Sequence, residues 1–213
     1  RLVSFTSTSD PLFLFGAIAI GFFHDPQLGA VIAFIHYTSS IIVGILMRFY
    51  QKKEQDADRL IRKKKKNDAL LKKAFKAMHQ ARIQDGRKFG KLMGDAVMSS
   101  INTLFMIGGF IILFSVILTV LTKINIILLI TKVITYLLIP LGISTELSQA
   151  IIHGFFEVTL GAKTVSEASM SLPMIEKIAI VSVISAWSGI SVHAQVAALL
   201  QKTDIRYTPF FFA

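Results

Sequence analysis

Residues 178–200 form an apolar stretch long enough to cross a membrane, and its middle reads Trp187-Ser188-Gly189-Ile190-Ser191-Val192-His193. Interrupted hydrophobic segments that carry ionisable residues are typical of the discontinuous helices of secondary transporters. If Gly189 ends one half-helix, the next half presents free N–H groups and a positive dipole end. We therefore expect an anionic ligand to be bound by Ser188, Gly189, Ser191, His193 and Gln195. A Gly/Ser-rich packing face between helices is the alternative.

The preceding apolar stretch, residues 151–162, is also interrupted. It holds Glu157 and Thr159 between two glycines and is followed by Lys163. A carboxylate in an apolar stretch is expensive and normally faces a partner, an ion path or a substrate. We expect Glu157, Thr159 and Lys163 to contact substrate. Alternatively, Glu157 caps a half-helix or pairs with Lys163, and Lys163 extends to the membrane interface.

A third interruption lies near the start, where a polar run ends in Ser9-Asp10-Pro11 before the short apolar stretch 11–23. Helix capping alone explains Ser9 and Asp10. When Leu2 is aligned with Ile180, however, four identities occur, and Asp10-Pro11 lies opposite Ser188-Gly189. The coinciding breaks predict an internal repeat, so Ser9 and Asp10 join the candidate site.

Uninterrupted apolar runs predict spanning helices over 28–47 and 97–121, which we interpret as scaffold, and a shorter helix over 126–139. Trp187 beside the break either stacks on a flat ligand or fills a gap. The expected fold is an all-α membrane protein: multi-pass helices with re-entrant hairpins and discontinuous helices in repeat halves.

The composition supports a membrane protein, since 53% of residues are hydrophobic and 17% are charged, against about 25% charged in soluble domains. The net charge is +10, and residues 48–91 alone hold sixteen Lys or Arg and five Asp or Glu. This excess predicts a cytoplasmic loop. An amphipathic helix around Leu70, Phe75 and Met78 predicts contact of residues 52–91 with anionic lipid or with the protein's own body. Lys63–Lys66 fits a solvated loop, and nucleic-acid binding is not expected.

The sequence carries no enzyme signature. His-Glu-x-x-His, phosphate-binding Gly loops and Gly-x-Ser-x-Gly are all missing, and the chain has no Cys. We expect neither an enzyme nor a cofactor or metal site, apart from a coupling proton or cation.

Three strings resemble the sporulation integral membrane protein YlbJ family: Ser4 to Phe13, Glu157 to Lys163, and Ser188 to Val196. The closing segment, Thr203 to Phe212, is similar too. The resemblance implies a nucleoside-recognition "gate" domain, similar in plan to concentrative nucleoside transporters, with two repeats of a re-entrant hairpin and a broken helix. It also implies a first hairpin before residue 1, so we expect the chain to be part of a longer protein.

The resemblance further implies transport of dipicolinate, a small flat dianion, across a membrane around the developing spore. Glu157 would repel a dianion unless it is protonated or a cation lies between them, so proton coupling is a natural hypothesis. A nucleoside would use Glu157 directly as a hydrogen-bond acceptor.

The predicted organisation has four parts. Residues 1–47 end the first gate repeat, 48–96 form the basic amphipathic loop, 97–139 form spanning helices, and 140–213 form the second gate repeat. The predicted function is alternating-access transport of a small anionic metabolite in the cell membrane. A nucleoside or nucleobase carrier and a non-transporting scaffold with a lipid- or partner-binding loop are the alternatives, and homo-oligomerisation stays open.

Overall fold

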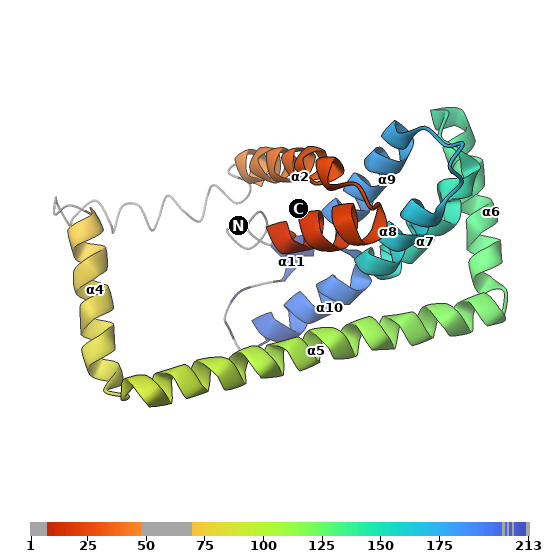
Figure 1. Cartoon of the computed structure of the whole chain (residues 1–213). Helices are drawn as coiled ribbons and strands as arrows, with labels where there is room; N and C mark the ends of the chain where they lie inside the picture. Colours follow the sequence, from red (N-terminus) through yellow and green to blue (C-terminus); the bar gives the residue numbers. More distant parts are fainter. Residues whose placement is uncertain (1–7, 48–69, 202, 204, 206, 212–213) are drawn as a thin grey trace. The chain divides into compact units, whose positions relative to one another are not determined.

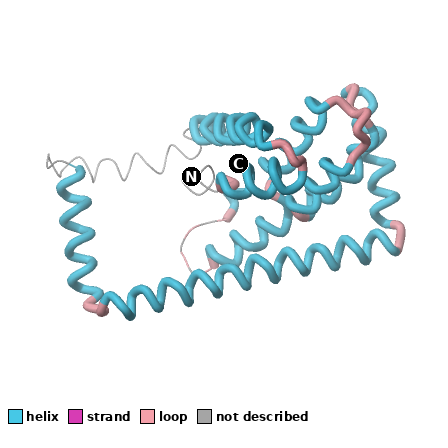
Figure 2. Tube along the Cα trace, in the orientation of Figure 1, coloured by secondary structure: helices cyan, strands magenta, loops and turns pink. Residues whose placement is uncertain are grey.

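The computed structural model describes residues 8–47, 70–201, 203, 205 and 207–211, and these residues form helices and short connections without a strand (Figures 1 and 2). The expected all-α fold is confirmed for this part of the chain. The chain divides into two units, which we describe separately. One comprises Arg1–Arg48 and Met106–Ala213, and the other comprises Phe49–Phe105. Lys63–Lys66 and the first string of the internal repeat, residues 2–7, lie outside the described residues.

In the described part of the chain, three helical segments are long and apolar enough to cross a membrane: Pro26–Met47 (α2), Phe89–Lys123 (α5), and Met174–Leu200, which is α9 and α10 together. These match the predicted spans, although α5 begins eight residues before the expected residue 97. Ile126–Leu138 (α6) follows a turn in which Asn125 has a φ of 60°. A 3-10 turn over Ile139–Leu141 (η2) ends this region at Pro140.

The first described helix, Leu12–Phe22 (η1), is a π-helix that packs against α2. Asp10 begins it, because its Oδ1 accepts a hydrogen bond of 2.7 Å from the N–H of Phe13. Leu14, Ile18 and Ala19 are fully buried. The ring of Phe15 packs against Gly29 of α2, in the space that a Cβ on residue 29 would occupy. Residues 8–10, where an interruption was expected, are not helical, and the segment before them lies outside the described residues.

Residues 148–167 form a tight helical hairpin rather than one helix. After the short turn Thr145–Leu147 (η3), α7 covers Ser148–Phe156 and α8 covers Val158–Glu167. A Cβ built on Gly161 would lie 2.3 Å from the Cα of Gly154, seven residues earlier. One turn of α-helix rises only about 5.4 Å, so seven residues of unbroken helix would hold these atoms about 10 Å apart. The chain therefore reverses at Glu157, as the predicted hairpin requires.

The last long segment is broken where the sequence predicted. Helix α9 (Met174–Trp187) ends at Ser188, which has a φ of 66°, and α10 (Gly189–Leu200) starts at Gly189, which has a φ of 81°. The main core joins these elements to the hairpin and to η1, with Leu147, Ala162, Val165, Val181 and Ile184 buried among them. A short helix, Thr208–Phe211 (α11), follows.

The second unit contains Leu70–Asp85 (α4) and the start of α5. The expected helix around Leu70–Met78 is therefore present, and it continues seven residues beyond Met78.

The crossing of α7 and α8 predicts that Gly161→Ala destabilises the protein. The new methyl group would meet backbone, which cannot rotate away, so we expect unfolding to become easier by about 1–3 kcal/mol. Gly108→Ala is the control, because a Cβ there meets nothing within 4 Å. Thermal unfolding of the full-length protein in detergent measures both. Equal midpoints for the two variants would contradict the close crossing.

Candidate functional site

The tip of the α7–α8 hairpin touches the break between α9 and α10. A Cβ built on Gly189 would lie 3.1 Å from the Cα and N of Glu157 and from the carbonyl oxygen of Phe156. The backbone of Gly189 also has a positive φ, which L side chains rarely adopt. Both the contact and the conformation require glycine here. The two interruptions recognised in the sequence therefore meet in space.

Glu157 lies at this contact with only 1% of its surface exposed. Its backbone is extended, and its Oε2 accepts a hydrogen bond of 2.8 Å from the N–H of Leu160. The carboxylate therefore caps α8, as one sequence interpretation predicted. The alternative pairing with Lys163 is not observed, since the exposed Nζ of Lys163 lies 3.8 Å from Oε1 of Glu167.

A cavity of about 350 Å³ opens beside the tip, and we call it the break cavity. Six of the ten predicted site residues line it: Ser9, Asp10, Glu157, Thr159, Ser188 and Gln195. Thr8 adds a hydroxyl, and the remaining lining is apolar, including Phe13, Ile107, Ile111 and Val192. Its volume falls in the range of about 300–1,000 Å³ that is typical of small-molecule sites.

The ionisable side chains that line the break cavity are carboxylic acids. Asp10 and Glu157 are the ionisable groups among the described residues that line it, and it has no Lys, Arg or His there. One oxygen of each carboxylate accepts from a helix N–H, from Phe13 and from Leu160. The first N–H groups of α10 have no side-chain cap at Ser188. The cavity thus combines hydroxyls, an amide and two carboxylates with the positive end of a helix.

The other four predicted residues lie elsewhere. Gly189 contacts the hairpin tip, as described above, and Ser191 is buried, accepting from the Nε2 of Gln195 at 3.3 Å. Lys163 lines a different cavity together with Thr164 and Glu167. His193 lines a smaller cavity of about 120 Å³, which shares only Thr8 and Ser188 with the break cavity.

His193 completes the end of α9. Its Nε2 donates to the carbonyl oxygen of Trp187 at 3.2 Å, since a carbonyl can only accept. In the neutral ring, Nδ1 then accepts from the hydroxyl of Tyr207 at 2.6 Å. Trp187 stacks in parallel on Phe155, with ring centroids 5.5 Å apart, and donates its Nε1–H to the carbonyl of Phe155 at 3.0 Å. Trp187 therefore packs within the protein, and it also lines the smaller cavity of His193.

Comparison with curated proteins gives a relative over the whole length of the chain. The sporulation integral membrane protein YlbJ of Bacillus subtilis (strain 168) is 46% identical over 217 aligned positions, which cover 100% of this chain and 51% of the relative. The chain belongs to the YlbJ family. It spans about half the length of that relative. No family model matches the chain, and no solved structure matches it.

Membership of the YlbJ family agrees with the long apolar helices: this is part of an integral membrane protein. In that setting, the irregular backbone at Glu157 and Ser188 must be satisfied inside the protein, because the hydrocarbon core offers no hydrogen bonds. The capping contacts of Glu157 and His193 provide this for two of the helix ends.

Two residues of α2 hold the candidate site, although residues 28–47 of this YlbJ-family chain were predicted to be scaffold only. The Nε2 of His36 accepts from the N–H of Ser9 at 3.1 Å, and the hydroxyl of Tyr37 donates to the carbonyl of Ser9 at 3.1 Å. His36 is buried, and its accepting nitrogen must be unprotonated, since a backbone N–H always donates. One signal was available: a histidine is unusual within a smooth apolar span.

The contact at Gly189 predicts a local effect of Gly189→Ala. The variant adds both left-handed strain, about 1–2 kcal/mol, and a collision with the backbone of the hairpin tip. Gly142→Ala is the matched control, because Gly142 has a φ of 67° but nothing within 4 Å of its Cβ position. We expect Gly189→Ala to speed amide hydrogen exchange in residues 154–161, measured by mass spectrometry on the full-length protein. Unchanged exchange at the tip, or an equal rise in the control, would contradict the contact.

Proposed function

We propose that the YlbJ-family protein containing this chain is a membrane transporter that binds a small polar metabolite in the break cavity and moves it by alternating access. One observation carries the proposal. The start of η1 at Asp10, the helix break at Ser188 and the hairpin tip at Glu157, far apart in the sequence, all line the same cavity. Discontinuous helices around a midplane site are the recurring design of secondary transporters.

The free-energy cost of burying the Glu157 carboxylate supports a carrier over the scaffold alternative. Glu157 is the one buried carboxylate among the described residues, and a carboxylate at membrane depth is expensive and normally faces a partner, an ion path or a substrate. A scaffold could use Glu157 to cap α8 but has no use for a cavity lined by its carboxylate. The proposal is accordingly for a carrier, neither a scaffold nor an enzyme.

For the substrate, we propose dipicolinate, on the family resemblance. Its acceptor oxygens suit the uncapped start of α10 and the hydroxyls of Thr8, Ser9 and Thr159. Asp10 and Glu157 oppose a dianion, so the proposal includes a coupling proton or cation that neutralises them. Lys163, predicted to supply positive charge, lies outside this cavity.

A nucleoside or nucleobase is the second candidate, and the two carboxylates of the cavity favour it. Ribose hydroxyls and base N–H groups are donors that Asp10 and Glu157 accept without neutralisation. In either case, we propose a membrane around the developing spore as the location, with residues 48–91 on the cytoplasmic side.

Uptake by vesicles that contain the full-length protein tests the proposal. Labelled dipicolinate and labelled uridine are offered with and without an inward pH gradient. We expect Glu157→Gln to reduce uridine uptake by about 10- to 100-fold, the loss of one hydrogen bond to a charged group. If dipicolinate is the substrate, we expect its uptake by this variant to lose its response to the pH gradient, because an amide carries no coupling proton. Glu167→Gln is the matched control, since Glu167 is on the same helix but exposed and outside the break cavity.

The outcomes separate the candidates. Dipicolinate uptake that depends on the gradient and on Glu157 supports the first substrate, whereas uridine uptake that depends on Glu157 supports the second. Uptake of neither compound by folded protein, or equal effects of the two variants, would remove the support for a carrier that works through this cavity.

A further inference from the structure

Within its own unit, helix α4 has an apolar face that no other described segment covers. All its described side chains are exposed, including Leu71 at 73%, Phe75 at 64% and Met78 at 64%. These three residues, with Ala74, lie at the i, i+3, i+4 and i+7 spacings that place side chains on one helix face. A lone helix of this length is marginally stable in water, so the apolar face needs a cover.

The opposite face of α4 is basic. Lys72, Lys73, Lys76 and His79 lie there, and residues 70–95 together hold seven Lys or Arg and two Asp, a net charge of +5. An apolar stripe beside Lys residues is the pattern of helices that lie in the interface of a membrane with anionic lipid. Positive charge close to such a surface contributes about 1 kcal/mol per Lys or Arg.

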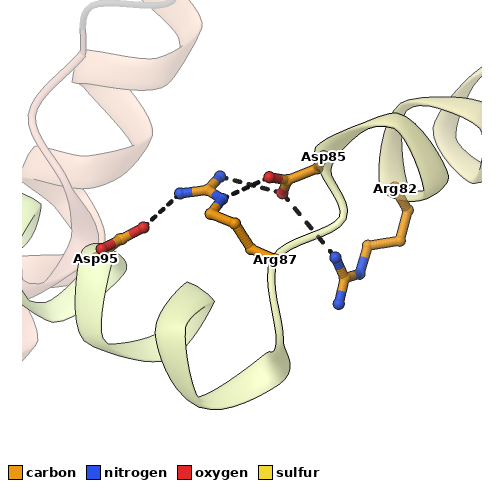
Figure 3. Close-up of polar contacts among 4 residues, drawn as sticks. All are labelled: Arg82, Asp85, Arg87 and Asp95. Carbon is orange, nitrogen blue, oxygen red and sulfur yellow. Dashed lines mark hydrogen bonds and ion pairs between the residues drawn. The ribbon is translucent and has the colours of Figure 1, made fainter.

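The two acidic side chains of this region are both paired with one arginine (Figure 3). Arg87 donates to the carboxylate of Asp85 at the end of α4, and its Nη1 lies 2.6 Å from Oδ2 of Asp95 in α5. Arg82 also lies 4.0 Å from Asp85. The hydrogen bond from Arg87 lowers the pKa of Asp85, so the pairing persists at neutral pH. Arg82 and Arg87 together offset the two negative charges that would repel anionic headgroups.

The same arginine bridges the corner between α4 and α5. The chain turns at Gly86, which has a φ of 61°, and Figure 1 shows α4 turned sharply away from the start of α5. The apolar run of α5 begins at Val97, two residues after Asp95. The corner therefore lies where a spanning helix leaves the hydrocarbon, which places α4 at the level of the headgroups.

We propose that α4 is a peripheral anchor that lies on an anionic bilayer surface, with Leu71, Ala74, Phe75 and Met78 toward the lipid, and that Arg87 fixes its orientation by bridging Asp85 and Asp95. The anchor does not depend on the transport function. Its occupant is the bilayer; cover by the protein's own body or by a second copy is an outcome that the test distinguishes.

Spin labels test the proposal in the full-length protein. This chain has no Cys, so single labels are introduced by Ala74→Cys on the apolar face and Gln80→Cys on the polar face, with any Cys elsewhere replaced. Nanodiscs of phosphatidylcholine and phosphatidylglycerol (3:1) are compared with phosphatidylcholine alone. In the anionic discs we expect the label at 74 to be accessible to oxygen and shielded from a water-soluble nickel chelate, and the label at 80 to show the reverse.

Variants of the lysines and of Arg87 test the two parts of the proposal separately. Lys72→Gln with Lys76→Gln should lower the ratio of lipid-bound to free α4 by about 30-fold. Arg87→Gln should move the label at 74 toward water, whereas Arg82→Gln, which does not reach Asp95, should leave it in place. A label at 74 exposed to nickel in every disc would overturn the proposal. So would a label at 74 shielded from both reagents in discs and in detergent, because protein would then be its cover.

Discussion

The described core of this chain depends on one close approach between backbones, where the hairpin tip at Phe156–Glu157 meets Gly189. A Cβ built on Gly189 would lie 3.1 Å from backbone atoms of the tip, so no side chain fits there. The hairpin and the broken helix therefore fix each other's position. The contact sets where α8 begins, where α9 ends and where the carboxylate of Glu157 lies. The break cavity is a consequence of it, since interrupted helices leave polar backbone and side chains facing one another.

Each interruption is stabilised by a different side chain. Glu157 accepts from the start of α8, His193 donates to the end of α9, and His36 with Tyr37 holds the backbone of Ser9 on both sides. A polar group left unpaired in an apolar interior costs about 1–3 kcal/mol, so these contacts permit irregular backbone at membrane depth. His36 does this with an unprotonated nitrogen, since its Nε2 accepts from the N–H of Ser9.

Much of this arrangement could be predicted from the sequence, because helix breaks leave local signals. Ser188-Gly189 and Glu157 between Gly154 and Gly161 marked both interruptions before any geometry was known. Which residues face one cavity is a different question, since it depends on how short helices are rotated. Lys163 falls on the side of α8 that carries Thr164 and Glu167, and His36 reaches Ser9 across 27 residues of sequence. Neither relation follows from spacing along the chain.

The polarity of the break cavity constrains what it can hold. The uncapped start of α10 offers N–H donors, whereas Asp10 and Glu157 each keep an acceptor oxygen beyond the one used in capping. A ligand that has only acceptors pairs with the N–H groups of α10 but faces the two carboxylates without a donor for them. A ligand that has only donors pairs with the carboxylates and leaves the N–H groups without an acceptor. The lining is matched by a molecule that carries both, or by an acidic molecule together with a proton or cation. The same two carboxylates therefore link the choice of substrate to the need for coupling.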